Sequence, residues 1–124
     1  MAQILAMDDD PVMRQLLLAI LQGAGHDVRV APDGRVGMAL FKAARPDVVI
    51  TDLLMPELDG VGVIRELQTL EPHLRIIALS GGGRVLTAET SLDVAKRLGA
   101  CIMVAKPFTA EEILDAVTAA LRPG

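Results

Sequence analysis

The sequence has very few aromatic side chains: it contains no tryptophan, no tyrosine and only two phenylalanines among 124 residues. Its core must therefore be built from aliphatic residues and methionine, which the 52% hydrophobic content supplies. The single cysteine excludes an internal disulfide and fits a reducing compartment. There is no run near the roughly 18 apolar residues of a membrane span, and the net charge of -4 disfavours direct nucleic-acid binding. We therefore expect one domain over residues 1–124, cytoplasmic and without membrane contact.

Short apolar runs alternate with helical periodicity along the whole chain. The runs that predict strands are residues 3–7, 26–31, 47–51, 75–80 and 101–105. The second run alternates polar and apolar residues, which is typical of an edge strand, whereas the others resemble strands buried on both faces.

Helix signals occupy the intervals between these runs. Asp10 and Pro11 predict an N-cap and a first turn, while Thr109 and Glu112 form the capping-box pattern of a last helix. Apolar residues at helical spacing are Leu17, Ile20, Leu21 and Ala24; Val36, Ala39, Leu40 and Ala43; Val63, Leu67 and Leu70; Leu92, Ala95 and Leu98; and Leu114, Val117 and Leu121. This alternation predicts an α/β fold with a parallel sheet and helices on both faces.

Polar side chains gather where four of the predicted strands end. Asp8 and Asp9 follow the first strand, Asp52 the third, Ser80 ends the fourth, and Lys106 follows the fifth. In open α/β sheets, ligands bind beyond these carboxyl ends, at the point where the strand order reverses. Neighbouring carboxylates repel one another unless a cation intervenes, and a set of oxygen ligands favours Mg²⁺. The sequence therefore predicts a magnesium site at this edge.

Charge balance indicates what such a site could do. Three carboxylates, one Mg²⁺ and one lysine sum to zero, so a phosphoryl group on Asp52 would add negative charge. Lys106 and the Ser80 hydroxyl are available to contact its oxygens. Aspartate is an established nucleophile that forms acyl phosphates, and phosphoryl transfer requires mainly positioning and charge neutralisation.

Four segments of the chain together resemble the response-regulator receiver domain of two-component signalling. They are "ILAMDDDP", "VVITDLLMPELDG", "IIALSGG" and "AKPF", in the family's order and at similar separations, and the similarity runs from about Ile4 to Leu121. The resemblance implies a doubly wound, flavodoxin-like (βα)5 fold whose five-stranded parallel sheet has the order 2-1-3-4-5.

The resemblance also implies a role for each polar residue at the strand ends. Asp52 would be the phosphoacceptor, Ser80 would close on the phosphoryl group, and Lys106, before a cis peptide bond to Pro107, would contact it. The implied Mg²⁺ ligands are Asp8, Asp9, Asp52 and the backbone carbonyl of Leu54. The chain would then catalyse only its own phosphorylation and dephosphorylation.

Protein partners are implied as well. A histidine kinase or histidine phosphotransfer protein would supply the phosphoryl group, and Arg14 and Leu18 on the first helix are predicted to dock it. The signal would pass to a downstream protein through the fourth helix, the fifth strand and the fifth helix, a face that a homodimer could also use. Met103 stands where the family usually has an aromatic switch residue, and its flexible side chain can pack in two ways.

Three alternatives remain open. The chain could be a receiver cut from a longer regulator with an output domain instead of a stand-alone regulator. A Mg²⁺-dependent phosphohydrolase would use Asp8 and Asp10 as its D-x-D motif and Asp8 as nucleophile, but it needs a cap insertion for which this chain has no room. A non-phosphorylated interaction module would not need the full set of polar residues at the strand ends.

Overall fold

The computed structural model describes residues 2–53, 60–80 and 102–122. Strands and helices alternate in the order β1 (Gln3–Met7), α1 (Pro11–Gly23), β2 (Asp27–Ala31), α2 (Gly34–Ala43), β3 (Val48–Asp52), α3 (Gly60–Leu70), β4 (Arg75–Ser80), β5 (Ile102–Ala105) and α5 (Ala110–Leu121). The helix predicted from Leu92, Ala95 and Leu98 lies outside the described residues.

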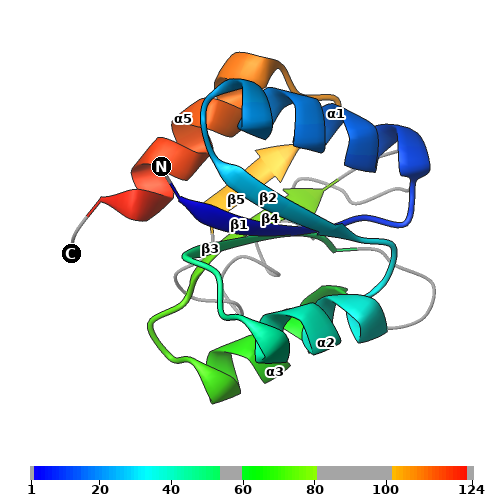
Figure 1. Ribbon diagram of the computed structural model, residues 1–124, viewed down its shortest axis with the longest axis vertical. Helices are drawn as coiled ribbons and strands as arrows, with labels where there is room; N and C mark the ends of the chain where they lie inside the picture. Colours follow the sequence, from blue (N-terminus) through cyan, green and yellow to red (C-terminus); the bar gives the residue numbers. More distant parts are fainter. Residues whose placement is uncertain (1, 54–59, 81–101, 123–124) are drawn as a thin grey trace.

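The sheet has the topology that the resemblance implied. All five strands are parallel, in the order β2-β1-β3-β4-β5, so that β2 and β5 form the edges. Helices α1 and α5 cover one face, and α2 and α3 cover the other (Figure 1). Because β1 hydrogen-bonds to both β2 and β3, the strand order reverses between β1 and β3. Ligands of such folds bind at this reversal.

Each face of the sheet carries its own hydrophobic cluster. Along β1, Ile4 and Ala6 belong to the cluster beneath α1 and α5, while Leu5 and Met7 belong to the cluster beneath α2 and α3. Successive side chains of a strand point to opposite faces, so β1 is buried on both sides, as its continuous apolar run predicted. The edge strand β2 keeps Asp27 exposed. The site at the strand ends is therefore supported by packed layers on both faces.

Helix α2 buries a face that only partly matches the one that apolar spacing predicted, since Val36 and Leu40 are half-buried and pack against the cluster beneath α2 and α3. The prediction named Val36, Ala39, Leu40 and Ala43. The structure buries Gly37, Met38 and Phe41, while Ala39 is exposed. A Cβ atom on Gly37 would collide with the side chain of Met7 in β1. The absence of that atom lets α2 lie close to the sheet, and the larger side chains of Met38 and Phe41 pack into the core beside it.

Two helix caps stand directly beside the predicted site. Asp10 accepts a hydrogen bond from the Val12 N–H at 2.9 Å and begins α1. Thr109 and Glu112 form a reciprocal capping box, with bonds of 3.1 and 2.9 Å, that begins α5 three residues after Lys106. Both caps agree with the sequence prediction. They fix the directions in which the chain leaves the carboxyl ends of β1 and β5.

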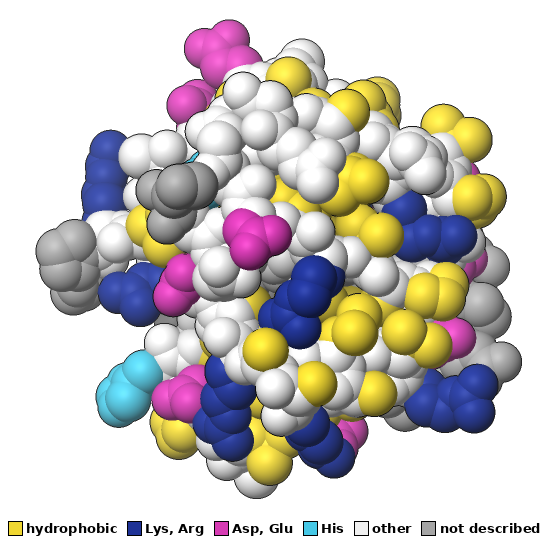
Figure 2. Space-filling model, in the orientation of Figure 1, with side chains coloured by type: hydrophobic (Ala, Val, Ile, Leu, Met, Phe, Trp, Pro, Cys, Tyr) yellow, Lys and Arg dark blue, Asp and Glu magenta, His cyan; other side chains and the backbone are white. Residues whose placement is uncertain are grey.

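The described surface is mixed in charge. Figure 2 shows acidic and basic side chains interspersed with apolar ones on the face seen in Figure 1. Among the described residues, no helix is long and apolar enough to cross a membrane.

Candidate functional site

Three carboxylates meet at the point where the strand order reverses. Asp8 and Asp9 lie in the connection from β1 to α1, and Asp52 is the last residue of β3. One carboxylate oxygen of each lies within 4.8 Å of the others. Asp8 has no exposed surface and Asp52 is only 5% exposed, whereas Asp9 faces solvent. The structure thus brings together the three acidic residues that the sequence singled out.

Lys106 lies between the two buried acids. Its Nζ atom donates to Oδ2 of Asp8 at 2.8 Å and to Oδ2 of Asp52 at 2.9 Å, and its side chain is only 8% exposed. The Lys106 N–H donates to the carbonyl of Ser80 at 2.7 Å, which holds the residue after β5 beside the end of β4. The peptide bond to Pro107 is cis, as the resemblance implied.

Burial sets the electrostatics of this group. It raises the pKa of Asp8 above 3.8, although hydrogen bonds from Lys106 and from the Asp10 N–H act in the opposite direction. Burial on its own would lower the pKa of Lys106, but its bonds to Asp8 and Asp52 outweigh this and raise the pKa above 10.5. The ammonium therefore stays charged. Three carboxylates against one ammonium leave a surplus of negative charge, which a cation could neutralise.

Ser80 lies on β4, the strand beside β3, and Met103 lies on β5, one strand further along the sheet. Ser80 ends β4 and is 8% exposed, and within the described residues its hydroxyl makes no hydrogen bond. Met103 pairs with Ala78 in the β4–β5 register and packs, half-buried, against the cluster beneath α2 and α3. Leu54 lies outside the described residues.

Helix α1 borders the acidic group and exposes apolar residues that the sequence analysis overlooked. Val12 is 73% exposed and Leu16 42% exposed. Leu18 is half-buried and packs against the cluster beneath α1 and α5, and its docking role stays a prediction. Arg14 bonds to the Asp8 carbonyl. Leu16 could have been found from sequence, because it is apolar and lies outside the predicted buried face.

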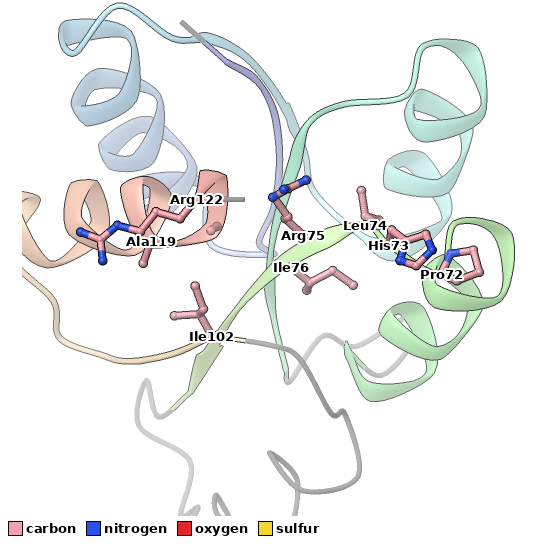
Figure 3. A pocket seen from close by; sticks show the side chains of 9 residues that line it. Pro72, His73, Leu74, Arg75, Ile76, Ile102, Ala119 and Arg122 are labelled. Atoms are coloured by element: carbon pink, nitrogen blue, oxygen red, sulfur yellow. The ribbon is translucent and has the colours of Figure 1, made fainter. Parts of the chain in front are cut away.

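A cavity of about 370 Å³ lies at the other end of the strands from the acidic group (Figure 3). Arg75 and Ile76 at the start of β4, Ile102 at the start of β5, and Ala119 and Arg122 at the end of α5 contribute to its lining. Because the strands are parallel, all of them start at one end of the sheet and finish at the other. The cavity therefore has no part in the chemistry of the acidic group.

Comparison with known proteins agrees with this geometry. The family model of the response regulator receiver domain matches residues 4–118. The chain belongs to the receiver-domain family. A phosphoryl-accepting switch is the general function of these receiver domains, which interact with histidine kinases and output domains.

Receiver domains of known structure superimpose closely on this one. The chemotaxis protein CheY4 of Vibrio cholerae is 32% identical with a TM-score of 0.87, over 98% of this chain and 99% of that one. The receiver domain of NtrX from Brucella abortus is 30% identical with a TM-score of 0.87, over 98% and 99% of the two chains. Both the family and the fold are thereby shown.

Curated relatives extend the similarity to longer proteins. The response regulator MprA of Mycolicibacterium vanbaalenii is 38% identical over 120 residues, which are 97% of this chain and 50% of that protein. The transcriptional regulator ycf27 of Galdieria sulphuraria is 37% identical over 120 residues and is covered to 45%. The chain thus spans about half the length of the curated relatives that it matches.

Proposed function

We propose that this receiver domain accepts a phosphoryl group on Asp52 in a Mg²⁺-dependent reaction and thereby changes its partner-binding face. The observation that carries the proposal is the convergence of Asp8, Asp9 and Asp52 around the ammonium of Lys106. Asp52 ends the buried strand β3 and holds its carboxylate at the strand-order reversal, where an incoming phosphoryl group can reach it. The chain would modify only itself and would not act as an enzyme on other substrates.

The residues at this edge fit a magnesium ion. Their side-chain ligands are oxygens, two of them buried and one facing solvent, and the group carries surplus negative charge. Asp8, Asp9 and Asp52 would hold the ion, with the Leu54 carbonyl as a further ligand implied by the family resemblance. A bound ion would neutralise the charge that develops on the transferring group.

Lys106 and Ser80 carry the remaining roles. Lys106 orients the Asp52 carboxylate and is placed to contact the new phosphoryl oxygens, because a phosphorylated Asp52 gains negative charge beside it. The Ser80 hydroxyl, without a bond to any described residue, can turn toward the same oxygens. Burial of both groups limits the access of water.

The surfaces beside the acidic group indicate which proteins would bind. A histidine kinase or histidine phosphotransfer protein would dock on α1, where Val12 and Leu16 offer exposed apolar surface and Arg14 bonds to the Asp8 carbonyl. Leu18 would support this surface from beneath. A downstream protein, or a second copy of the chain, would bind the face formed by the fourth helix, β5 and α5, with Met103 responding to Ser80. Its reaction with such donors and its single cysteine fit a cytoplasmic location.

Two rival functions are less well supported. A phosphohydrolase would need Asp10 in its active site, but the Asp10 side chain caps α1. A non-phosphorylated interaction module would gain nothing from burying two acids and a lysine, which costs desolvation free energy. Both a stand-alone regulator and a part of a longer one are compatible with the relatives, since CheY4 is matched over its whole chain and MprA over half.

Intact mass spectrometry tests the proposal directly. After incubation with Mg²⁺ and acetyl phosphate, the wild-type chain is expected to gain one phosphoryl group, and Asp52→Asn none. Asp115→Asn, an exposed substitution on α5, is the matched control and should react like the wild type. Chelation of Mg²⁺ should abolish the reaction.

Other outcomes would favour the rivals. An adduct that survives in Asp52→Asn and maps to Asp8 would support the phosphohydrolase. No adduct with acetyl phosphate or with a histidine-phosphorylated donor would support the interaction module.

A further inference from the structure

Arg14 reaches back from α1 to the end of β1. Its Nη1 atom donates to the backbone carbonyl of Asp8 at 2.9 Å, in a half-buried position. Among the described residues Arg14 forms no ion pair, so this contact is a directed hydrogen bond and not a simple attraction between charges. A cation near the amino end of a helix is opposed by the helix dipole. The bond to the carbonyl compensates for that unfavourable placement.

The bond from Arg14 completes a clamp on the backbone of Asp8. On one side of the Asp8 Cα atom, the N–H donates to the Ala31 carbonyl of β2 at 3.1 Å. On the other side, the carbonyl accepts from Arg14. When both flanking peptide groups are fixed, the direction of the Cα–Cβ bond is fixed as well. The clamp therefore fixes the point and the direction from which the Asp8 side chain leaves the backbone.

The carboxylate itself accepts two further hydrogen bonds. Oδ1 accepts from the Asp10 N–H at 3.0 Å, and Oδ2 accepts from Lys106. A metal ion bound by Asp8 and Asp52 competes with Lys106 for the same carboxylates. When the lysine turns to another partner, the backbone clamp still orients Asp8. Bonds that orient metal ligands in this way commonly contribute to metal affinity.

We infer that Arg14 is a positioning residue, which holds the Asp8 carboxylate in the direction required to bind Mg²⁺. The inference rests on the proposed function of the acidic group as a Mg²⁺ site. It assigns Arg14 a role within the domain, separate from the docking role predicted from sequence.

Calorimetric titration with Mg²⁺ tests the inference without any phosphoryl transfer. The chain has no tryptophan or tyrosine to report binding by fluorescence. For Arg14→Gln the Mg²⁺ Kd is expected to rise about tenfold, the lower end of the range for substitutions behind metal ligands, because Arg14 bonds to the backbone of Asp8 and not to its carboxylate. Arg14→Met, which keeps the apolar part of the side chain, repeats the test with a different residue. Arg65→Gln, which removes an exposed arginine from α3, is the matched control and should stay within about twofold.

Rescue and unfolding measurements separate positioning from a merely structural role. Arg14→Lys keeps a donor and should recover part of the affinity, and thermal unfolding of each metal-free variant should show that the fold persists. Glutamine and methionine form helices about as well as arginine does. Unchanged Mg²⁺ affinity in Arg14→Gln and Arg14→Met would overturn the inference.

Phosphorylation kinetics separate positioning from docking. At low Mg²⁺, positioning predicts that Arg14→Gln slows the reaction equally with acetyl phosphate and with a histidine-phosphorylated protein, and that saturating Mg²⁺ restores both rates. A loss confined to the protein donor at every Mg²⁺ concentration would leave Arg14 as a docking residue only. If the wild type binds Mg²⁺ but accepts no phosphoryl group, the proposed function fails, while the Kd values still decide the role of Arg14.

Discussion

Asp8 and Lys106 form a buried ion pair in which the charged form of the acid is disfavoured by burial. Asp8 has no exposed surface, and the raised pKa of its carboxyl group means that the fold disfavours its charged form. Ionisable groups whose pKa is shifted by burial and by specific partners concentrate at functional sites. Neutralising such a group should therefore stabilise the metal-free protein even though it removes a proposed metal ligand.

Asp8→Asn is expected to raise the free energy of unfolding in metal-free buffer by ~1 kcal/mol near neutral pH. Because burial raises the pKa of Asp8 above 3.8, the folded wild type binds this proton more tightly than the unfolded chain does. The contribution of Asp8 to wild-type stability then falls as the pH rises through the window between 3.8 and the higher folded pKa. Asparagine does not titrate, so the advantage of the variant grows through this window and is absent below it.

Urea denaturation at a series of pH values, with chelator present, checks this prediction. Lys106 stays protonated throughout the window, since its pKa lies above 10.5, and it keeps its bond to Asp52 in the variant. Asp115→Asn, an exposed substitution on α5, is the matched control and should show no such trend. A wild type that gains stability over Asp8→Asn as the pH rises would contradict the account.

At the scale of elements, the contact between α2 and β1 holds in place the strand end that carries Asp8. Gly37 in α2 lies against Met7, the residue immediately before Asp8. Met7 has no exposed surface, so its side chain has little room to move. The close approach of helix and strand therefore holds the end of β1 in place.

Gly37→Ala should lower the free energy of unfolding by about 1–3 kcal/mol, because the added methyl group overpacks the contact with Met7. Gly23→Ala, at the exposed end of α1, is the matched control: a Cβ there meets nothing within 4 Å. It should stabilise the protein by about 0.5 kcal/mol or slightly more, since alanine favours the helix. Chemical denaturation of both variants would show opposite signs. If Gly37→Ala stabilised the protein as much as Gly23→Ala does, the Met7 side chain would have to move aside without strain.

At the scale of the whole molecule, the group formed by Asp8, Asp9 and Asp52 should couple metal binding to the stability of the fold. Three carboxylates brought together from β1 and β3 repel one another in the folded state only. An ion that binds this arrangement and not the unfolded chain shifts the folding equilibrium by mass action. The proposed Mg²⁺ site should therefore be visible in unfolding experiments.

Mg²⁺ is expected to stabilise the wild type by about 1.4 kcal/mol when its concentration is ten times the Kd. The Tm in a thermal scan should rise with Mg²⁺ and return to its starting value with chelator. Asp9→Asn removes a proposed ligand that is exposed and makes no bond to Lys106, so this variant should unfold like the wild type without metal and gain less from Mg²⁺. An Asp9→Asn curve that responds fully to Mg²⁺ would exclude Asp9 as a ligand.

Features that depend on local sequence were predicted closely. The runs 3–7 and 75–80 match β1 and β4, because a continuous apolar run between polar residues defines a buried strand. Asp10 and Thr109 cap their helices as expected, since a cap needs only a side chain and a backbone N–H within a few residues. The strand ends that carry Asp8 and Asp52 follow from the same local signals.

Contacts between distant segments were decided by the tertiary structure alone. Lys106 bonds to Asp8 across 98 positions of sequence, and only the packing of β4 and β5 beside β3 brings them together. Spacing predicted the buried face of α2 only in part, because the close approach at Gly37 depends on Met7 in another element. Sequence by itself determined the order of elements and the residues at the strand ends. Which of those residues touch, and how deeply they are buried, was set by the arrangement of strands and helices, because burial and long-range bonds depend on neighbours that are remote in sequence.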